Sequence, residues 1–188
     1  MTAPAGRRAT YDDLLRLPDN VIGEIVDGEL IASPRPALPH SHATSALGGE
    51  LLPPFGRGRG GPGGWWILDE PELHLGPDVL VPDLAGWRRE RLPTIPAEPF
   101  LALAPDWACE VLSPSTARLD RVRKLRVYAR EGVGHVWLVD PAARTLEILR
   151  RDGEAWVLAA THAEAERVRA EPFGAIELEL AALWIDPG

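Results

Sequence analysis

Two acidic residues stand inside segments that are otherwise almost entirely apolar. Asp83 belongs to the run VLVPDLAGW, and Glu110 belongs to the run WACEVL. Ionised carboxylates rarely occupy such segments unless they are paired, hydrogen-bonded or bound to a metal. If the two predicted strands are neighbours, both carboxylates meet at one end of a sheet, where oxygen ligands of this kind suit Mg²⁺ or Mn²⁺. The alternative is a pair of strand-end acids that face solvent or pair with arginine.

Lys124 is the single lysine of a chain that contains 19 arginines. It follows Glu110 on a predicted helix, where Asp120, Lys124 and Tyr128 share one face. A right-handed crossover from the Glu110 strand brings that face over the same end of the sheet. A lysine ammonium is compact and can sit beside a water or a phosphoryl oxygen, whereas an arginine guanidinium is a planar fork. Lys124 is therefore a candidate catalytic residue, and the alternative is a solvent-exposed lysine without a role.

The segments that must position these residues alternate between strands and two main helices. A capped segment from Thr10 predicts a short helix, and Asp27-Gly28 predicts a hairpin turn. Helical spacing predicts two longer helices, over about 39–52 and about 117–131. Strands are predicted for 65–75, 78–87, 106–112 and 135–141, a hairpin for 145–159 around Asp152-Gly153, and a strand or short helix for 176–184.

This order of elements predicts an α/β fold. It consists of a central mixed β-sheet flanked by helices, with a crossover helix after Glu110 and added β-hairpins. A length of 188 residues fits a single domain over 1–188. Its core is expected at about 11–152, with a C-terminal strand or hairpin extension at 153–188.

The distribution of charge bears on possible partners. A net charge of −8 and a pI near 5.1 argue against a nonspecific nucleic-acid binder, because phosphate contacts need local positive charge. The predicted helix around Lys124 carries arginines at 118, 121, 123, 126 and 130. These arginines either steer a polyanion or form a solvated face that is balanced in part by acids.

A Pro/Gly/Arg segment, PPFGRGRGGPGG at 53–64, is interpreted as a surface loop. A phosphate-binding loop is disfavoured because no Gly-Lys-Ser/Thr follows and the next segment is β-prone. Contact of its backbone with a polyanion is the lesser alternative.

Cysteine usage and hydropathy indicate the cellular compartment. One cysteine, Cys109, cannot form an internal disulfide and is expected to be a buried core residue. No apolar run reaches the length of a membrane span, and residues 1–20 lack the apolar segment of a signal peptide. These features predict a cytoplasmic protein without membrane contact.

Several short motifs follow one another in a fixed order between about residues 11 and 152. They are Glu24-x-x-Asp27-Gly28-Glu29-Leu30, His40, Val81-Pro82-Asp83, the segment from Glu110 to Thr116, Asp120, Lys124, Tyr128, and Gly132-Val133 before HVWLVDP. This ordered set resembles the Uma2 family, a former domain of unknown function in the PD-(D/E)xK nuclease superfamily. The resemblance implies a restriction endonuclease-like core with a divalent metal at one end of the sheet.

The resemblance also implies roles for individual residues. Asp83 matches the aspartate of the PD motif and Glu110 the second acid, and both would bind Mg²⁺ or Mn²⁺. The family's usual lysine two residues after the second acid is replaced by Leu112, so Lys124 is the natural substitute and reaches the site from the helix. Glu24 matches a family acid that would complete the metal site, unless it is an ordinary surface residue of the hairpin.

Substrate contact is predicted for three further residues. His40 stands at a predicted helix start beside His42, and Arg121 and Tyr128 lie on the helix that carries Lys124. The alternative for the two histidines is simple exposure to solvent.

The leading functional hypothesis is a metal-dependent endonuclease that hydrolyses phosphodiester bonds of nucleic acid, DNA rather than RNA. By analogy, an enzyme that cuts both strands would be a two-fold homodimer. The main alternative is a noncatalytic partner-binding or oligomerisation module, favoured by the acidic composition and by seven tryptophans, several of them expected at an exposed dimer face. A glycosidase-type pair of carboxylates ranks last because it gives Lys124 no role.

Overall fold

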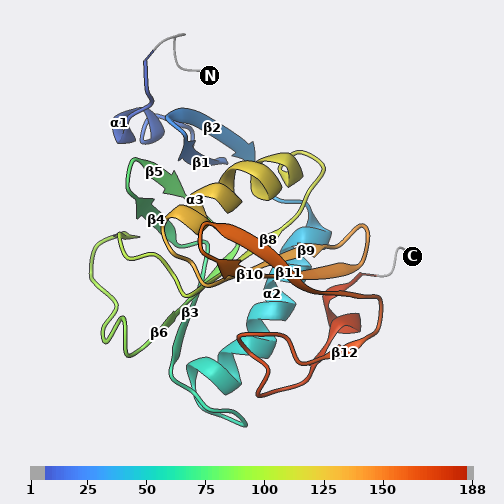
Figure 1. Ribbon diagram of the computed structural model, residues 1–188. Helices are drawn as coiled ribbons and strands as arrows, with labels where there is room; N and C mark the ends of the chain where they lie inside the picture. Colours follow the sequence, from blue (N-terminus) through green and yellow to red (C-terminus); the bar gives the residue numbers. More distant parts are fainter. Residues whose placement is uncertain (1–6, 186–188) are drawn as a thin grey trace.

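Two β-sheets form the framework of the molecule (Figure 1), and the computed structural model describes residues 7–185. The larger sheet has six strands in the order β11-β10-β9-β8-β6-β3. Its strands are β3 Trp65–Asp69, β6 Leu84–Arg88, β8 Trp107–Val111, β9 His135–Asp140, β10 Thr145–Asp152 and β11 Ala155–Ala163. The other sheet has five strands in the order β2-β1-β5-β4-β7. Its strands are β1 Val21–Val26, β2 Glu29–Pro34, β4 Glu72–Leu75, β5 Asp78–Leu80 and β7 Phe100–Leu101.

Two helical segments pack against the larger sheet. The first is α2 Leu38–Leu51, which continues into a π-helical turn, η1 Leu52–Gly56. The second begins with a π-helical turn, η2 Leu119–Lys124, and continues as α3 Leu125–Arg130. The remaining elements are α1 Tyr11–Leu14, the paired strands β12 Arg167–Val168 and β13 Leu178–Glu179, and the short 3-10 helix η3 Leu180–Leu183. No helix within residues 7–185 is long and apolar enough to cross a membrane.

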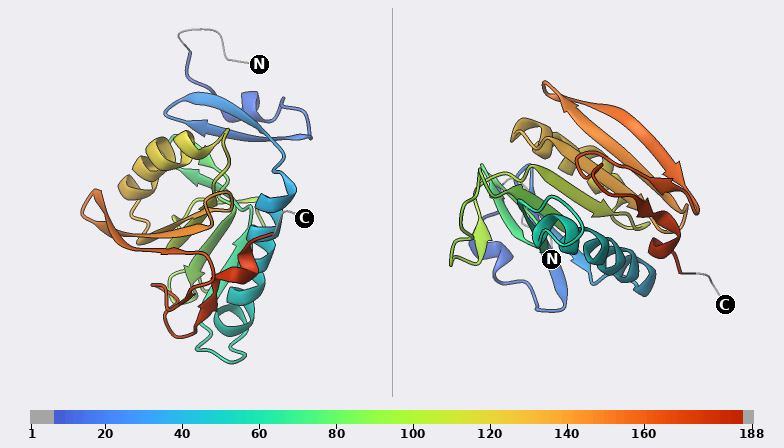
Figure 2. Two further views of the ribbon diagram at one scale, coloured as in Figure 1. Left: turned by 90° about the vertical axis from the view of Figure 1, so that its right-hand side faces the viewer. Right: turned by 90° about the horizontal axis from the view of Figure 1, so that it is seen from below.

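The two helical segments cover opposite faces of the six-stranded sheet (Figure 2). Successive side chains of a strand point to opposite faces. In β8, Trp107 and Cys109 therefore pack into the hydrophobic cluster that includes α2, whereas Ala108, and Leu112 just after the strand, pack into the cluster that includes α3. Glu110 has the parity of the second pair, so its side chain is directed toward η2 and α3.

The sheet register brings the two predicted metal-binding acids together. Strand β6 pairs antiparallel with β8, with Leu84 opposite Cys109. Continuing this register by one residue puts Asp83 opposite Glu110. On its other side β8 runs parallel to β9, and η2 and α3 connect the two strands. The predicted adjacency of the two strands and the crossover helix after Glu110 are both confirmed.

The segment 65–87 contains four strands where two were predicted. A proline lacks the N–H donor that a ladder needs, so Pro71 and Pro82 interrupt the two predicted runs. The chain passes between the two sheets at both of these breaks. As a result, Asp83 stands just before β6 and not inside a strand.

The other predicted elements agree with the structure except at one loop. The short first helix, both hairpins, the two longer helices and the burial of Cys109 are confirmed. The first residues of the predicted loop 53–64 instead belong to η1. Pro53 and Pro54 cannot donate the backbone hydrogen bonds of an α-helix. The turn is closed by a hydrogen bond from the Arg57 N–H to the Leu52 carbonyl, which spans five residues instead of four.

A group of aromatic rings joins the C-terminal segment to the sheet. Phe173 is fully buried, and its ring centroid lies 4.7 Å from that of Phe55 and 4.9 Å from those of Trp65 and Trp107. All seven tryptophans are buried or half-buried. The expectation that several tryptophans are exposed at a dimer face is therefore wrong.

Phe173→Ala tests whether the C-terminal segment contributes to the main hydrophobic core. We expect the free energy of unfolding in urea to fall by about 3–5 kcal/mol, because the substitution leaves a cavity among aromatic rings. Val157→Ala on the exposed side of β11 is the control and should change stability by less than about 1 kcal/mol. An equal, small effect of both variants would contradict the packing described here.

Candidate active site

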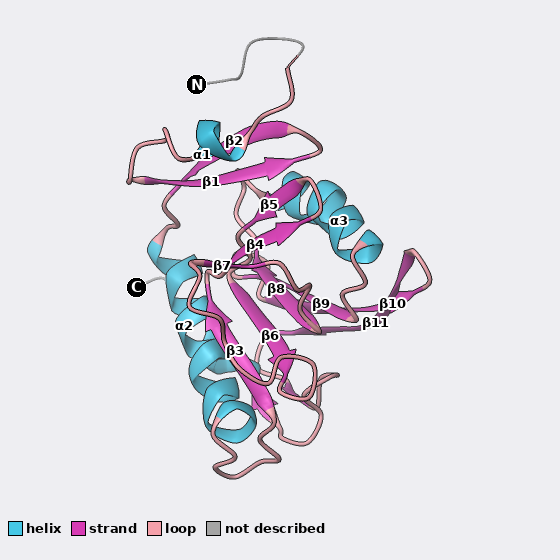
Figure 3. Cartoon of the chain, turned by 90° about the vertical axis from the view of Figure 1, so that its left-hand side faces the viewer, coloured by secondary structure: helices cyan, strands magenta, loops and turns pink. Residues whose placement is uncertain are grey.

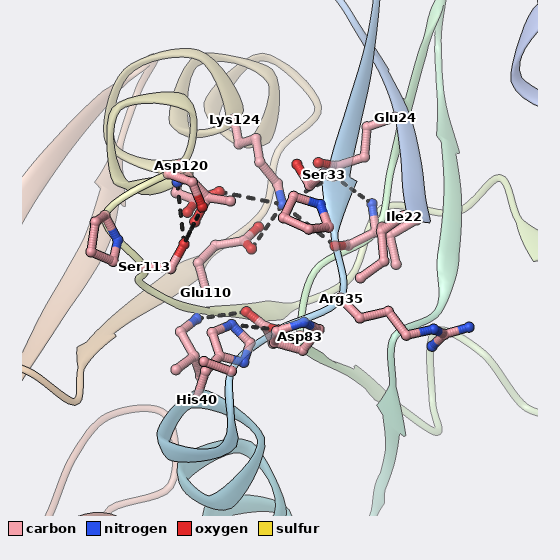
Figure 4. A pocket seen from close by; sticks show the side chains of 18 residues that line it. Ile22, Glu24, Ser33, Arg35, His40, Asp83, Glu110, Ser113, Asp120 and Lys124 are labelled. Carbon is pink, nitrogen blue, oxygen red and sulfur yellow. Dashed lines mark hydrogen bonds and ion pairs between the residues drawn. The ribbon is translucent and has the colours of Figure 1, made fainter. Parts of the chain in front are cut away.

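A pocket of about 260 Å³ lies where several elements meet (Figure 4). The first hairpin, the start of α2, the approach to β6, the end of β8 and the start of the second helical segment each contribute to its wall. Most of its charged side chains are acids. The charged and titratable residues that line it are Glu24, Arg35, His40, Asp83, Glu110, Asp120 and Lys124.

Lys124 is the centre of this group and is only 3% exposed. Its ammonium nitrogen Nζ lies 2.8 Å from Glu110 Oε2, 3.0 Å from Glu24 Oε1 and 3.6 Å from Asp120 Oδ1. Burial alone lowers the pKa of Lys124, but the carboxylates of Glu110 and Glu24 outweigh burial and raise the pKa well above its ordinary value. The alternative of a solvent-exposed lysine is wrong, and the ammonium is held charged among acids.

Glu110 is fixed from both of its carboxylate oxygens. Lys124 donates to Oε2, and the hydroxyl of Tyr128 donates to Oε1. Burial raises the pKa of Glu110 well above its ordinary value; Lys124 opposes this shift, whereas Asp120 and Asp83 reinforce it. The alternating pattern of β8 directs this one polar side chain of the strand toward the helix that carries both donors.

Asp83 stands at the opening of the pocket, where its side chain keeps 14% exposure. Its Oδ2 accepts a hydrogen bond of 2.7 Å from the Val111 N–H, one residue beyond Glu110. Its Oδ1 lies 3.2 Å from Nε2 of His40. The carboxylate is thus anchored to the end of β8 through the backbone, which keeps it beside Glu110.

His40 belongs to the first turn of α2 and lines the pocket. Burial lowers its pKa, but the hydrogen bond and charge of Asp83 outweigh burial, and the pKa is raised above its ordinary value. Its second ring nitrogen, Nδ1, is buried and has no hydrogen-bond partner among the described residues. His40 is therefore in the pocket, whereas His42 is exposed and contacts the carbonyl of Ala182.

Glu24 is a pocket residue and is not the surface glutamate that the hairpin position allowed. It is 4% exposed, and its Oε1 accepts a hydrogen bond of 2.8 Å from the Val81 N–H. Its position on β1 places a carboxylate from the five-stranded sheet beside Lys124. The site thus draws its acids from both sheets.

Two predicted substrate-binding residues have other surroundings. Tyr128 is fully buried, donates to Glu110 and does not line the pocket. Arg121 is exposed outside the pocket, and its guanidinium makes hydrogen bonds of 2.7 and 2.8 Å to the carboxylate of Glu147 on β10. The structure brings Asp83, Glu110, Lys124, Glu24 and His40 together, but it does not bring Arg121 to them.

The sequence interpretation assigned no role in the site to two charged residues of the pocket. Asp120 is buried one helical turn before Lys124, and the spacing of four residues between them was a usable signal. Arg35, on the connection between β2 and α2, lines the pocket and donates to the carbonyl of Asp19. Nothing in the sequence around Arg35 distinguishes it from the other arginines.

The pocket carries surplus negative charge. Four carboxylates line it, whereas its cations are the buried Lys124 and Arg35, which is exposed at the rim. Burial raises the pKa of Asp120, and Glu24 and Asp83 raise it further, although Lys124 and a hydrogen bond from Thr116 oppose them. An added cation would relieve this repulsion.

The donor set suits a hard cation such as Mg²⁺. Carboxylate oxygens are its preferred protein ligands, and one or two of them suffice when water and phosphate complete the coordination. Within residues 7–185, however, no three His, Cys, Asp or Glu side chains are grouped so that they could hold a metal ion together. A cation bound here would therefore need water to complete its coordination.

Comparison with solved structures shows the fold. A crystal structure described as "a putative nuclease belonging to DUF820", from Anabaena variabilis, has a TM-score of 0.74 with this chain at 22% sequence identity. The match covers 93% of this chain and 97% of that one, so the predicted α/β fold with mixed sheets is confirmed. The model of the Uma2 family, described as "Putative restriction endonuclease", matches residues 10–182, and the chain belongs to this family. A search of the curated proteins found no match.

Lys124→Met tests whether the ammonium is required to stabilise the buried acids. We expect the free energy of unfolding to fall by about 3–5 kcal/mol, because Glu110 and Glu24 are left buried without their cation. Adding Glu24→Gln should restore part of the loss, since one uncompensated charge is then removed. Arg126→Met, at an exposed position of the same helix, should change stability by no more than about 0.5 kcal/mol in urea unfolding. No recovery in the double variant would argue against charge repulsion as the cause.

Proposed function

We propose that this chain is a metal-dependent endonuclease that hydrolyses phosphodiester bonds of nucleic acid, with DNA as the preferred substrate. The observation that carries the proposal is the convergence of Asp83, just before β6, and Glu110, on the paired strand β8, on a pocket that also contains Lys124 and surplus acid. The family description and the fold of the Anabaena protein support the same class of activity.

Asp83 and Glu110 would hold Mg²⁺ or Mn²⁺ in this proposal, and Glu24 would support the site from the other sheet. The bound cation would lower the pKa of a water and neutralise charge on the scissile phosphate. Asp83 suits this role because its half-buried side chain lines the pocket, while its Oδ2 stays fixed by the Val111 N–H. Glu110 suits it because Tyr128 and Lys124 fix its orientation.

Lys124 and His40 would act on the substrate side of the pocket. A charged ammonium that is already held in place can orient the attacking water or stabilise charge that develops on the phosphoryl group, with no reorganisation at the moment of reaction. Nε2 of His40 is engaged by Asp83 and Nδ1 is buried, so contact of His40 with substrate would require Nε2 to leave Asp83. Arg35 is an additional cation at the rim that suits contact with a phosphate.

The noncatalytic alternative keeps the fold as a binding or oligomerisation module. Its support from exposed tryptophans is lost, because all seven are buried or half-buried. A buried lysine among three carboxylates also exceeds what a binding module needs, since buried ion clusters rarely improve stability over apolar packing.

A homodimer and a cytoplasmic location remain part of the proposal for the enzyme. The glycosidase-type pair again ranks last, because it leaves the central Lys124 without a function.

Cleavage of labelled duplex DNA and of RNA in Mg²⁺ or Mn²⁺ tests the proposed reaction. Asp83→Asn and Glu110→Gln should each lower the cleavage rate by about 100-fold or more, because a bound metal supplies several kcal/mol of transition-state stabilisation. Glu147→Gln replaces an acid outside the pocket and should leave the rate unchanged. Full activity in Asp83→Asn or Glu110→Gln, with thermal stability like that of the wild type, would exclude these residues as metal ligands.

The affinity for Mn²⁺ tests how Lys124 and a metal share the same oxygens. Because the ammonium already binds Glu110, a cation at that carboxylate competes with it. We expect the Lys124→Met/Glu24→Gln variant to bind Mn²⁺ about tenfold more tightly than Glu24→Gln alone in calorimetric titration, a difference of about 1.4 kcal/mol. Its cleavage rate should nevertheless be lower. Weaker Mn²⁺ binding in the double variant would show that Lys124 supports the metal site instead of competing for it.

A further inference from the structure

The Gly/Arg loop at 57–64 lies beyond the C-terminal end of α2, at the opposite end of this helix from its first turn (Figure 3). His40, in the first turn of α2, lines the pocket, and η1 leads directly into the loop. The helical stretch 38–56 contains 19 residues, which corresponds to about 28 Å at 1.5 Å per residue. The loop is therefore too distant to be part of the pocket.

Four exposed arginines gather at this end, which we call the basic end: Arg57, Arg59, Arg88 and Arg89. Arg89 joins the loop to β6, because its backbone N–H donates to Gly64 at 2.9 Å and its guanidinium donates to the Gly56 carbonyl at 2.8 Å. None of the four forms an ion pair with a carboxylate among residues 7–185. Exposed Glu90 is the adjacent acid in the chain, and the neighbouring pair of Arg91 and Asp106 balances itself.

Two of these guanidinium groups are held over tryptophan rings. Arg88 Cζ lies 4.6 Å from the ring centroid of Trp65, and Arg89 Cζ lies 3.9 Å from that of Trp66. Cation–π contacts orient a guanidinium without neutralising its charge. The positive charge of these arginines is therefore fixed in place and still available to an anion.

The loop itself is ordered by backbone hydrogen bonds. The Arg59 and Gly63 N–H groups donate to the carbonyls of Pro53 and Pro54, each at 2.8 Å. Gly58 and Gly60 have positive φ angles of 65° and 77°, a conformation that favours glycine. Without side chains at these positions, a phosphate can approach the backbone between the two loop arginines.

Most arginines of the helical segment that carries Lys124, in contrast, are paired with carboxylates. Arg121 forms an ion pair with Glu147. Arg123 pairs with Asp27 and Glu29, and Arg130 pairs with Asp78 and Glu131. Arg118 and Arg126 are exposed. Three of the five arginines that could have steered a polyanion are therefore neutralised, which makes the basic end the larger group of unneutralised charge.

We infer that the basic end binds the phosphodiester backbone of the nucleic acid whose scissile bond lies in the pocket. The inference rests on the proposed function, because that function supplies the class of ligand. A separation of about 28 Å corresponds to roughly eight steps of 3.4 Å along one strand. The contact is independent of sequence, since it involves phosphates and not base edges.

The test measures binding of a fluorescent 20-base-pair duplex as a function of salt, by anisotropy and in EDTA so that no cleavage occurs. Each phosphate contact contributes about 0.9 to the slope of log K against log salt. Arg57→Gln/Arg59→Gln should weaken binding and reduce this slope by about 2. Arg150→Gln/Arg167→Gln is the matched control, because it removes the same charge from exposed arginines that already have acid partners, and it should leave the slope almost unchanged.

Several outcomes would overturn the inference. These are equal slopes for the two double variants, no binding of duplex by the wild type, or equal loss of binding in the control. Asp83→Asn separates this inference from the proposed reaction, because it should abolish cleavage in Mg²⁺ without weakening the binding of duplex in EDTA. Intact binding by every loop variant, together with loss of cleavage in Asp83→Asn, would reject the basic end and leave the proposed reaction standing.

Discussion

The burial of one ammonium among three carboxylates is the constraint on which the rest of the structure depends. Removing each charged group from water costs several kcal/mol, and only close, well-directed contacts offset that cost. The contacts of Lys124 meet this requirement because its partners come from three separate elements: Glu24 on β1, Glu110 on β8 and Asp120 on η2. The five-stranded sheet, the six-stranded sheet and the helix are thereby fixed around one point, and the pocket is the space that they enclose.

The same constraint explains why lysine is kept at this position in a chain that otherwise uses arginine. Three carboxylates surround one nitrogen here, and a compact ammonium can face all of them, whereas a planar guanidinium directs its donors in a fixed fork. It also explains why position 112 can be leucine. The positive charge reaches Glu110 from the helix, so the strand position two residues later is released to the apolar cluster, where Leu112 is buried.

The sequence predicted what local pattern determines. Apolar runs, Asp-Gly turns and helix spacing predicted most elements, and helix spacing also predicted that Asp120, Lys124 and Tyr128 share one face. The partners of individual side chains were beyond reach, because they depend on segments far apart in the chain: Glu147, which neutralises Arg121, is on β10. Tyr128 is a second example. Helix spacing predicted that it shares a face with Lys124, but not that its hydroxyl donates to Glu110.

The distribution of charge connects the pocket to the rest of the surface. A phosphodiester approaching an acidic pocket is repelled until a cation reverses the local charge, so attraction in the absence of metal must come from elsewhere on the molecule. In a chain with a net charge of −8, few surfaces can supply it. The basic end has four arginines without acid partners among the described residues, and two of them are held over tryptophan rings. A basic end that attracts a polyanion would allow the pocket to keep the surplus acid that suits a metal.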